Sequence, residues 1–449
     1  MTDFVNAEPT KRFFIQMLTR DISLEAAIVD LVDNSIDSMA RTRGLSLDES
    51  LLDEKAMDRK AKAFREAGLP RIDITIDEKH VSIEDNCGGI SYKNAKDEVF
   101  RFGRVADPKR SRLSVYGIGL KRAVFKIGRD ITIASKTTKD GFLVQINVDE
   151  WAKTDHWQFP IEEQDPARTD SKTGTRIMIK RLTDDVEARI GDGKLLGKLH
   201  ELISKAYTLL VDRFVIIHVN GARVKAQPIP IGLSSKVTPA REQFDYDGVR
   251  ITMVAGLSER SADGEWTLDR AGWYVLCNGR TVIFADKGDL TGWGVGLPQF
   301  VSKYRGFVGV VFLFSENPEA LPWTTTKRGL NLESRVYQRV RNRMAVLARP
   351  VVTFLNNMYP SGEVEEPGER AIAGTVKQQD IGTVLRKSGI AFQISMPERP
   401  SGPPMVSIQY KVRKDRLELA KKILQKPSWA ATRVGEHTFN YFLGHEGPK

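Results

Sequence analysis

Asp30, Asn34 and Asp37 are the first residues of the chain whose types and spacing could do chemistry. At spacings of four and three residues they share one face of a helix. A carboxylate beside a bound phosphate can orient and deprotonate water, and an amide oxygen suits Mg2+, which prefers oxygen ligands. The pattern predicts a base at Asp30 and a metal ligand at Asn34, although a merely solvated acidic helix face would have the same sequence.

A second candidate group follows a predicted strand. Asp85 stands where an alternating apolar and polar run ends, and Gly88 and Gly89 come shortly after it. A carboxylate there can accept the exocyclic amine of adenine, and glycine allows a base to approach the backbone closely. Thr175, which leads into a later strand, offers a hydroxyl that could support Asp85. Taken alone, Asp85 could equally be an acidic residue in a tight turn.

A glycine-rich loop supplies the third group, Gly117-Ile118-Gly119-Leu120-Lys121, which opens a predicted helix. The first backbone N–H groups of a helix have no partner within it and can bind a phosphate. Lys121 opposes the helix dipole unless an anion lies nearby, which favours a phosphate over a plain glycine turn. The loop matches neither the P-loop nor the Rossmann fingerprint. The three groups together predict a pocket for a magnesium nucleotide.

The surrounding elements predict a mixed α/β sandwich. Residues 23–40 carry apolar side chains at spacings of three and four, typical of an amphipathic helix, and residues 45–68 resemble a solvated helical insertion. Five runs alternate between apolar and polar residues as strands do: 72–76, 81–83, 131–135, 142–148 and 176–179. Their order lacks the strand–helix–strand rhythm of a doubly wound parallel sheet.

The rest of the chain divides by composition. We expect a nucleotide-binding domain over residues 1–190 and a second domain, with several strand-like runs, over residues 195–350. Residues 351–404 are rich in proline, glycine and glutamate, which predicts a partly ordered linker. Residues 405–449 regain a strand-like run and a basic amphipathic helix, so we expect a small basic C-terminal module there.

The composition limits the class of protein. Of 449 residues, 41% are apolar and 28% are charged, which is typical of a soluble globular protein. No apolar run approaches the ~20 residues needed to cross a bilayer, and the first residues do not have the pattern of a secretory signal. Cys87 and Cys277 offer neither a disulfide framework nor zinc spacing. We therefore expect a cytoplasmic protein, with nucleoid or nucleus as alternatives.

The net charge of +10 is concentrated in two stretches, between residues 100 and 130 and between residues 327 and 349. Large positive charge favours polyanionic partners, but it also serves solubility. These side chains could bind a nucleotide, contact a nucleic-acid backbone or lie on a solvated surface.

The ordered motifs resemble the GHKL superfamily of ATPases, which includes gyrase-type topoisomerases, ninety-kilodalton heat-shock chaperones, histidine kinases and MutL. The stretch 116–121, continuing through Ile127-Gly128-Arg129, is most similar to MORC-type ATPases. The resemblance covers residues 10–190 well and extends loosely over 195–350, which is similar to the transducer domain of gyrase and MutL. It implies a two-layer α/β (α+β) sandwich of the GHKL (Bergerat) type with a mixed sheet, then a transducer-like α/β domain and a small C-terminal region.

The resemblance also implies roles for single residues. Asp30 would activate water and Asn34 would bind Mg2+. Asp85 would read adenine with Thr175 behind it. The ATP-binding set would be completed by the turn and loop residues Gly89, Gly117, Ile118, Gly119, Leu120 and Lys121.

Lys327 is similar to the transducer lysine that reaches the γ-phosphate in gyrase and MutL, although it could otherwise be an exposed basic loop residue. Two positions depart from the family pattern. Asp30 stands where the family usually has Glu, so turnover could be slow. Cys87 stands where the family's first turn glycine would be, which makes that turn less certain.

These features predict ATP binding and hydrolysis, with ATP and Mg2+ as cofactors, driving an ATP-gated dimerisation clamp. The basic charge and the resemblance to MutL and MORC favour DNA as its substrate, in repair, chromosome handling or defence against foreign DNA. We expect a homodimer when ATP binds, double-stranded DNA as a partner and a separate effector subunit as a further candidate. Two alternatives stay open: a nucleotide-gated scaffold with negligible turnover, and a chaperone-like clamp on protein clients.

Overall fold

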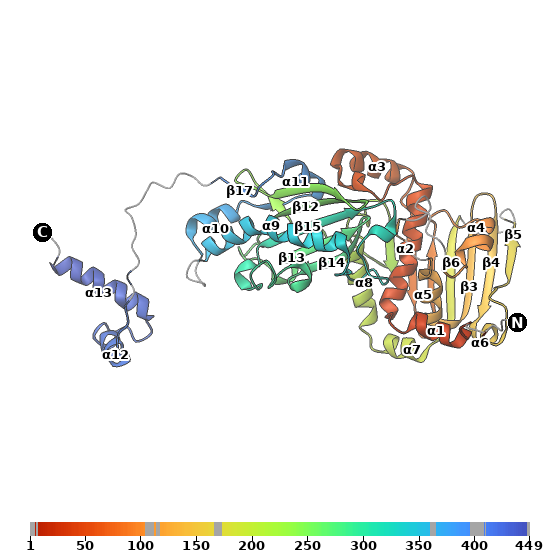
Figure 1. Cartoon of the computed structure of the whole chain (residues 1–449), viewed down its shortest axis with the longest axis horizontal. Coiled ribbons are helices and arrows are strands. Elements are labelled where there is room, and N and C mark those ends of the chain that lie inside the picture. The colour runs from red at the N-terminus through yellow and green to blue at the C-terminus, as the bar shows by residue number, and fades with distance from the viewer. Residues whose placement is uncertain are drawn as a thin grey trace. The chain divides into compact units, whose positions relative to one another are not determined.

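A computed structural model gives the structure of the following residues: 5, 8–103, 112–113, 117–165, 173–359, 365–395, 408 and 410–446. The chain forms two units, Met1–Met396 and Pro397–Lys449 (Figure 1). Among the described residues, no helix has the length and apolar character that crossing a membrane would require.

The N-terminal part of the first unit is built on an eight-stranded sheet with the order β5-β4-β3-β6-β2-β1-β7-β8. Its strands are β1 (Arg71–Ile76), β2 (His80–Asp85), β3 (Gly128–Lys136), β4 (Gly141–Asn147), β5 (Ile161–Gln164), β6 (Gly174–Leu182), β7 (Ile216–Val219) and β8 (Ala222–Arg223). Only the β1–β7 pair is parallel, so the sheet is mixed. Because β7 and β8 belong to it, this sheet extends beyond the boundary expected at residue 190.

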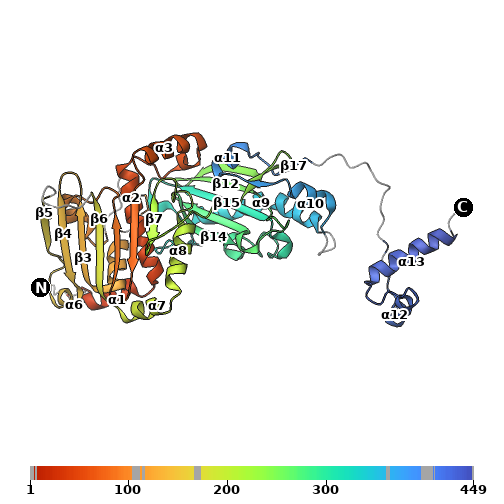
Figure 2. The same cartoon turned by 180° about the vertical axis from the view of Figure 1, so that it is seen from behind.

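Helices cover one face of this sheet, and Figure 2 shows β3, β4 and β6 from the other face. The helices of this part are α1 (Lys11–Thr19), α2 (Leu24–Thr42), α3 (Glu54–Glu66), α4 (Tyr92–Asn94), α5 (Gly119–Ile127), α6 (Val148–Lys153), α7 (Asp184–Gly191) and α8 (Leu195–Ala206). A π-helical turn, Ala95–Val99, follows α4. The predicted mixed α/β sandwich is confirmed.

Helix α2 begins as predicted, because the hydroxyl of Ser23 accepts a hydrogen bond from the backbone N–H of Ala26. Nearly all of its residues are buried, including Asp30 and Asp33. It packs against α5 and α8. The alternative of a solvated acidic face is therefore wrong, and the carboxylates of α2 need partners inside the protein.

The predicted insertion at residues 45–68 is helical, with η1 (Glu49–Leu52) before α3. It is not simply solvated, because Met57, Ala61 and Phe64 on α3 are buried. The ring of Phe64 meets that of Phe214 edge to face at 5.2 Å. The insertion therefore packs onto the body of the protein.

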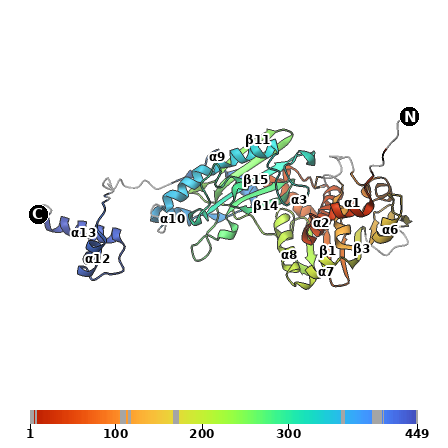
Figure 3. The same cartoon turned by 60° about the horizontal axis from the view of Figure 1, so that its bottom comes forward.

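A second sheet follows in the same unit, with the order β11-β12-β15-β13-β14. Its strands are β11 (Ala240–Tyr246), β12 (Val249–Leu257), β13 (Gly272–Cys277), β14 (Arg280–Asp286) and β15 (Phe307–Phe314). The long helix α9 (Arg335–Met358) packs along β11, β12 and β15, as Figure 3 shows. Every residue of β13 and β15 is buried, so this sheet forms the core of the region.

The predicted linker over residues 351–404 is wrong for the residues described up to 395. Helix α9 continues into it, and it contains α10 (Pro367–Ala373), α11 (Ile381–Lys387), β16 (Lys377–Gln378) and β17 (Gln393–Ile394). The strand β16 pairs with β9 (Gly232–Leu233), and β17 pairs with β10 (Val237–Thr238). Apolar residues such as Ile372 and Val384 are buried here, and Pro367 begins a helix rather than a loop. Residues 396–404 lie outside the described part.

The second unit contains α12 (Lys414–Ile423) and α13 (Ala431–Glu446). The predicted basic helix is confirmed as α12, whereas residues 408 and 410–412 of the predicted strand are not in a strand. Val434 is the one buried hydrophobic residue among those described in this unit.

Candidate functional site

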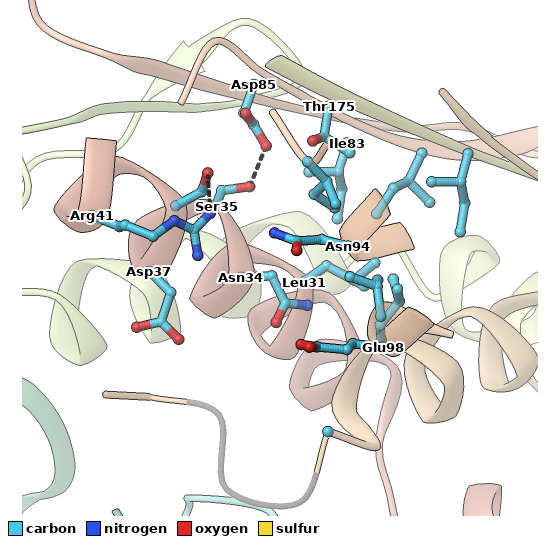
Figure 4. Close-up of a pocket in the computed structure, with 17 residues that line it drawn as sticks. Leu31, Asn34, Ser35, Asp37, Arg41, Ile83, Asp85, Asn94, Glu98 and Thr175 are labelled. Atoms are coloured by element: carbon cyan, nitrogen blue, oxygen red, sulfur yellow. Dashed lines mark hydrogen bonds between the residues drawn. The ribbon is translucent and has the colours of Figure 1, made fainter. Parts of the chain in front are cut away.

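A cavity of about 330 Å3 lies between α2, the sheet and the start of α5. Figure 4 shows Asp85 and Thr175 on the sheet side, with Ser35 of α2 pointing towards Asp85 and Asn34 and Asp37 pointing to the opposite side. The predicted site residues that line this cavity are Asn34, Asp85, Gly117, Leu120 and Thr175. The others lie outside its lining: Asp30, Gly89, Ile118, Gly119, Lys121 and Lys327.

The Asp85 end of the cavity is a network of short hydrogen bonds. Asp85 Oδ2 accepts from Ser35 Oγ at 2.6 Å, and Oδ1 accepts from the backbone N–H of Cys87 at 2.9 Å. Burial raises the pKa of Asp85, while these hydrogen bonds oppose that shift. In the sheet Asp85 pairs with Thr175, whose hydroxyl lies 2.8 Å from that of Ser135. Ser35, which sequence analysis missed, lies one residue after Asn34.

The turn after Asp85 depends on its glycines. Gly88 and Gly89 have φ values of 106° and 72°, a region that other residues rarely adopt. A Cβ on Gly89 would lie 2.1 Å from the carbonyl oxygen of Lys136. Gly89 therefore shapes the turn rather than lining the cavity. Cys87 is not among the residues with positive φ and is buried, so a side chain is compatible with this position.

Asn34 projects from α2 into the cavity, and its Nδ2 is buried without a hydrogen-bond partner in the described structure. An amide in that setting has unused hydrogen-bonding capacity towards whatever fills the cavity. Its oxygen is the type of ligand that Mg2+ takes, so the residue fits a magnesium site. The described residues contain no cluster of three or more His, Cys, Asp or Glu side chains that could hold a metal alone.

The glycine loop meets the cavity at Gly117 and Leu120, and α5 begins at Gly119. Gly117 has a φ of 61°, which favours glycine. The ammonium group of Lys121 is buried and donates to the carbonyl oxygens of Val99 and Gly117. In this conformation Lys121 thus binds backbone carbonyls of its own loop and of the π-helical turn. Tyr116 and most of the basic stretch before it lie outside the described residues.

Asp30 lies one helical turn before Asn34. Its Oδ2 accepts a hydrogen bond from Arg122 Nη2 at 2.6 Å. Its Oδ1 is 4.0 Å from Lys327 Nζ and has no hydrogen-bond partner in the described structure. This buried oxygen therefore has unused capacity to accept a hydrogen bond.

Asp33, on the same helix, binds two cations that come from far along the chain. Its Oδ2 accepts from Lys327 Nζ at 2.7 Å and from Arg280 Nη1 at 2.5 Å. Its Oδ1 accepts from the hydroxyl of Tyr207 at 2.7 Å. Burial and the charge of Asp33 raise the pKa of Tyr207 well above its ordinary value, so the hydroxyl remains a donor.

We refer to Asp30, Asp33, Arg122, Arg280 and Lys327 as the charge cluster. Their exposed fractions are 2%, 1%, 6%, 2% and 8%, so the alternative of Lys327 as an exposed loop residue is wrong. Three cations face two carboxylates, which leaves one positive charge in excess among these five side chains. Sequence analysis missed Asp33, Arg122 and Arg280, and only Asp33 lies within a motif.

Comparison with known proteins agrees with the geometry. Residues 22–176 match the family model described as histidine kinase-, DNA gyrase B-, and HSP90-like ATPase. No curated protein matches the chain. The matched segment contains α2, Asp85, the glycine loop and Thr175, so this part of the chain is a GHKL-type ATPase domain. Domains of this class bind ATP, usually with Mg2+, and use it for hydrolysis or phosphoryl transfer.

Proposed function

We propose that the chain binds Mg-ATP in the cavity and hydrolyses it. Adenine would lie at Asp85 and Thr175, and the phosphates would run towards Asn34 and Gly117. One observation carries the proposal. Within the matched ATPase segment, Asp85 and Asn34 line one cavity, and Asp30, whose Oδ1 accepts no hydrogen bond in the described structure, lies one helical turn before Asn34. The cavity volume of about 330 Å3 is within the range of small-molecule sites.

Asp30 is our candidate for the base, because its Oδ1 is the carboxylate oxygen left to accept a proton from water. Asn34 would hold Mg2+ through its amide oxygen, and the ion would neutralise charge on the phosphate oxygens. The turn at Gly89 would let the base approach the backbone, and the loop of Gly117, Ile118, Gly119, Leu120 and Lys121 would accommodate the phosphates. Lys121 would have to leave its backbone partners to take part.

Lys327 is our candidate for the side chain that reaches the γ-phosphate. Its φ of 52° is rare for a residue other than glycine. Strain of this kind persists only where surrounding contacts hold it, as the ion pairs of Lys327 do here. Because Arg280 also binds Asp33, Lys327 can move to a phosphate without leaving that carboxylate unpaired.

We further propose that ATP binding favours a homodimer and that the protein acts as an ATP-gated clamp on double-stranded DNA, with residues 195–350 as a transducer-like domain. The exposed face of α9 supports DNA over a protein client. Arg335, Arg339 and Arg349 are exposed there, and none of them forms an ion pair with any described residue. Their spacing of four and ten residues keeps them on one side of the helix.

A second candidate, a nucleotide-gated scaffold with negligible turnover, is favoured by one observation. Asp30 does not line the cavity and is bound to Arg122. If Asp30 stays outside the lining when ATP binds, its Oδ1 cannot reach the attacking water. The residue is also one methylene shorter than the usual Glu.

Steady-state ATP hydrolysis, with and without double-stranded DNA, tests these functions. We expect turnover that Asp30→Asn lowers by about 100-fold or more, with ATP binding retained, and stimulation by DNA. The matched control is Asp73→Asn, which changes a carboxylate of β1 that binds Arg71 away from the cavity. ATP binding without turnover in the wild type would favour the scaffold, and DNA binding that is absent or insensitive to salt would contradict the clamp on DNA.

A further inference from the structure

Arg122 is a buried arginine of α5 that touches two parts of the ATPase site at once. Its Nη2 donates to Asp30 Oδ2 at 2.6 Å and to the backbone carbonyl oxygen of Thr325 at 3.2 Å. Thr325 lies in the turn that carries Lys327, which is closed by a hydrogen bond from Lys327 N to Thr324 O at 2.8 Å. Arg122 therefore connects the candidate base to the loop of the candidate phosphate lysine.

The contact with Asp30 limits what that carboxylate can do. A charge-assisted hydrogen bond of this length is stronger than a neutral one and holds the side chain in one orientation. With Oδ2 occupied by Arg122, Oδ1 is the oxygen that remains for a water molecule. An aspartate is shorter than the usual glutamate and has fewer ways to reach the same water, so its orientation matters more.

The contact with Thr325 makes that orientation depend on the loop. The guanidinium group is planar and presents its donors in a fixed arrangement, so both acceptors must be in place for both bonds to form. If residues 324–327 move, Arg122 loses the carbonyl of Thr325, and the direction of its bond to Asp30 changes. The orientation of Asp30 and the position of Lys327 therefore both depend on how residues 324–327 pack against Arg122.

We propose that Arg122 is a positioning residue for Asp30 and that it makes the orientation of this carboxylate dependent on the docking of residues 324–327. The inference rests on the proposed function, hydrolysis of ATP with Asp30 as the base. It differs from a purely structural ion pair, which would affect folding but not the chemical step. It also differs from a lock that keeps Asp30 inactive, whose removal would speed hydrolysis.

The test compares Arg122→Gln and Arg122→Lys with the wild type in kcat, KM and melting temperature. We expect kcat to fall about 10- to 100-fold in Arg122→Gln, as small displacements of a catalytic group do, with KM changed less than about threefold. Arg122→Lys keeps the charge and should recover part of kcat. In an Asp30→Asn background, Arg122→Gln should cause no further loss, because Arg122 acts through Asp30.

Arg189→Gln is the matched control. Arg189 also binds a carboxylate of α2, Glu25, in the first turn of that helix and outside the cavity lining. It should leave kcat unchanged. If it lowers kcat as much as Arg122→Gln does, the effect comes from disturbing α2 and the inference is wrong.

The remaining outcomes distinguish failure of this inference from failure of the proposed hydrolysis of ATP. Turnover that is unchanged or faster in Arg122→Gln overturns the inference while ATP hydrolysis stands. Parallel losses of kcat, ATP binding and melting temperature mean a structural role and also overturn it. No turnover in the wild type overturns the hydrolysis proposal and the positioning role together. If Arg122→Gln does not fold, Arg122→Lys carries the test: a lowered kcat with the melting temperature retained supports the inference, and a kcat equal to that of the wild type overturns it.

Discussion

The two ends of the site are built in different ways. At the Asp85 end, the partners Ser35, Cys87 and Thr175 all lie within residues 22–176, the matched ATPase segment. At the charge cluster, Asp30 and Asp33 lie within that segment, whereas Arg280 and Lys327 come from residues beyond it. The Asp85 end therefore needs no residue from beyond the matched segment, whereas the charge cluster needs Arg280 and Lys327.

On the proposed function, this difference would separate recognition of ATP from its hydrolysis. The Asp85 end uses hydrogen bonds to hydroxyl and backbone groups, so it is formed whenever the sheet and α2 are folded. The charge cluster needs the loop of Lys327 and the start of β14 to be docked on α2. We therefore expect ATP to bind to the N-terminal part in many states of the protein, and hydrolysis to require the docked state.

Asp33→Asn should have the largest effect on stability. The change leaves the buried Arg280 and Lys327 without their shared carboxylate. Breaking a buried ion pair in this way costs about 3–5 kcal/mol. Chemical denaturation measures the loss, and Asp130→Asn is the matched control, because its pair with Arg181 is exposed and should contribute little to stability. Equal losses in the two variants would mean that the charge cluster does not hold the two regions together.

The same contrast explains what the sequence could predict. Helix α2, the strands β1 and β2, and the position of Asp85 at the end of β2 were predicted because periodicity and turn residues are local signals. Arg280 was not found, since it is 247 residues from Asp33 and lies in no motif. Arg122 was passed over because a basic residue after a glycine loop suggests phosphate binding, whereas here it binds a carboxylate. The structure also buries α2 on several sides, which its amphipathic pattern did not indicate.

Asp85→Asn should have the next largest effect, and on ATP binding rather than on hydrolysis. Replacing a charged acceptor removes a hydrogen bond of about 1.5–3 kcal/mol, so we expect the Kd for ATP to rise about 10- to 100-fold. Glu84→Gln is the control, because Glu84 is the exposed neighbour on β2. Titration calorimetry measures both variants. An unchanged Kd in Asp85→Asn would mean that adenine is bound elsewhere.

The Asp85 end should contribute to the pH dependence of stability. Burial raises the pKa of Asp85, so its contribution to folding is full below the ordinary pKa of aspartate and is lost as pH rises through the raised value. Asp85→Asn removes this dependence. The free energy of unfolding of the variant, relative to that of the wild type, should therefore increase as pH rises above about 4. Denaturation at several pH values tests this, and a relative free energy that decreases would contradict the raised pKa.

Cys87→Gly should have the smallest effect. It restores the glycine usual in the family, but the backbone at Cys87 is not in the left-handed region, so glycine brings no relief of strain. The variant loses a buried side chain and gains flexibility in the unfolded chain, which together cost about 1–2 kcal/mol. Because Asp85 receives its hydrogen bond from the backbone N–H of residue 87, which glycine keeps, the Kd for ATP should stay within about twofold. A large gain in ATP affinity would show instead that the thiol distorts the turn, and the Asp85 end would then be less completely formed than its hydrogen bonds indicate.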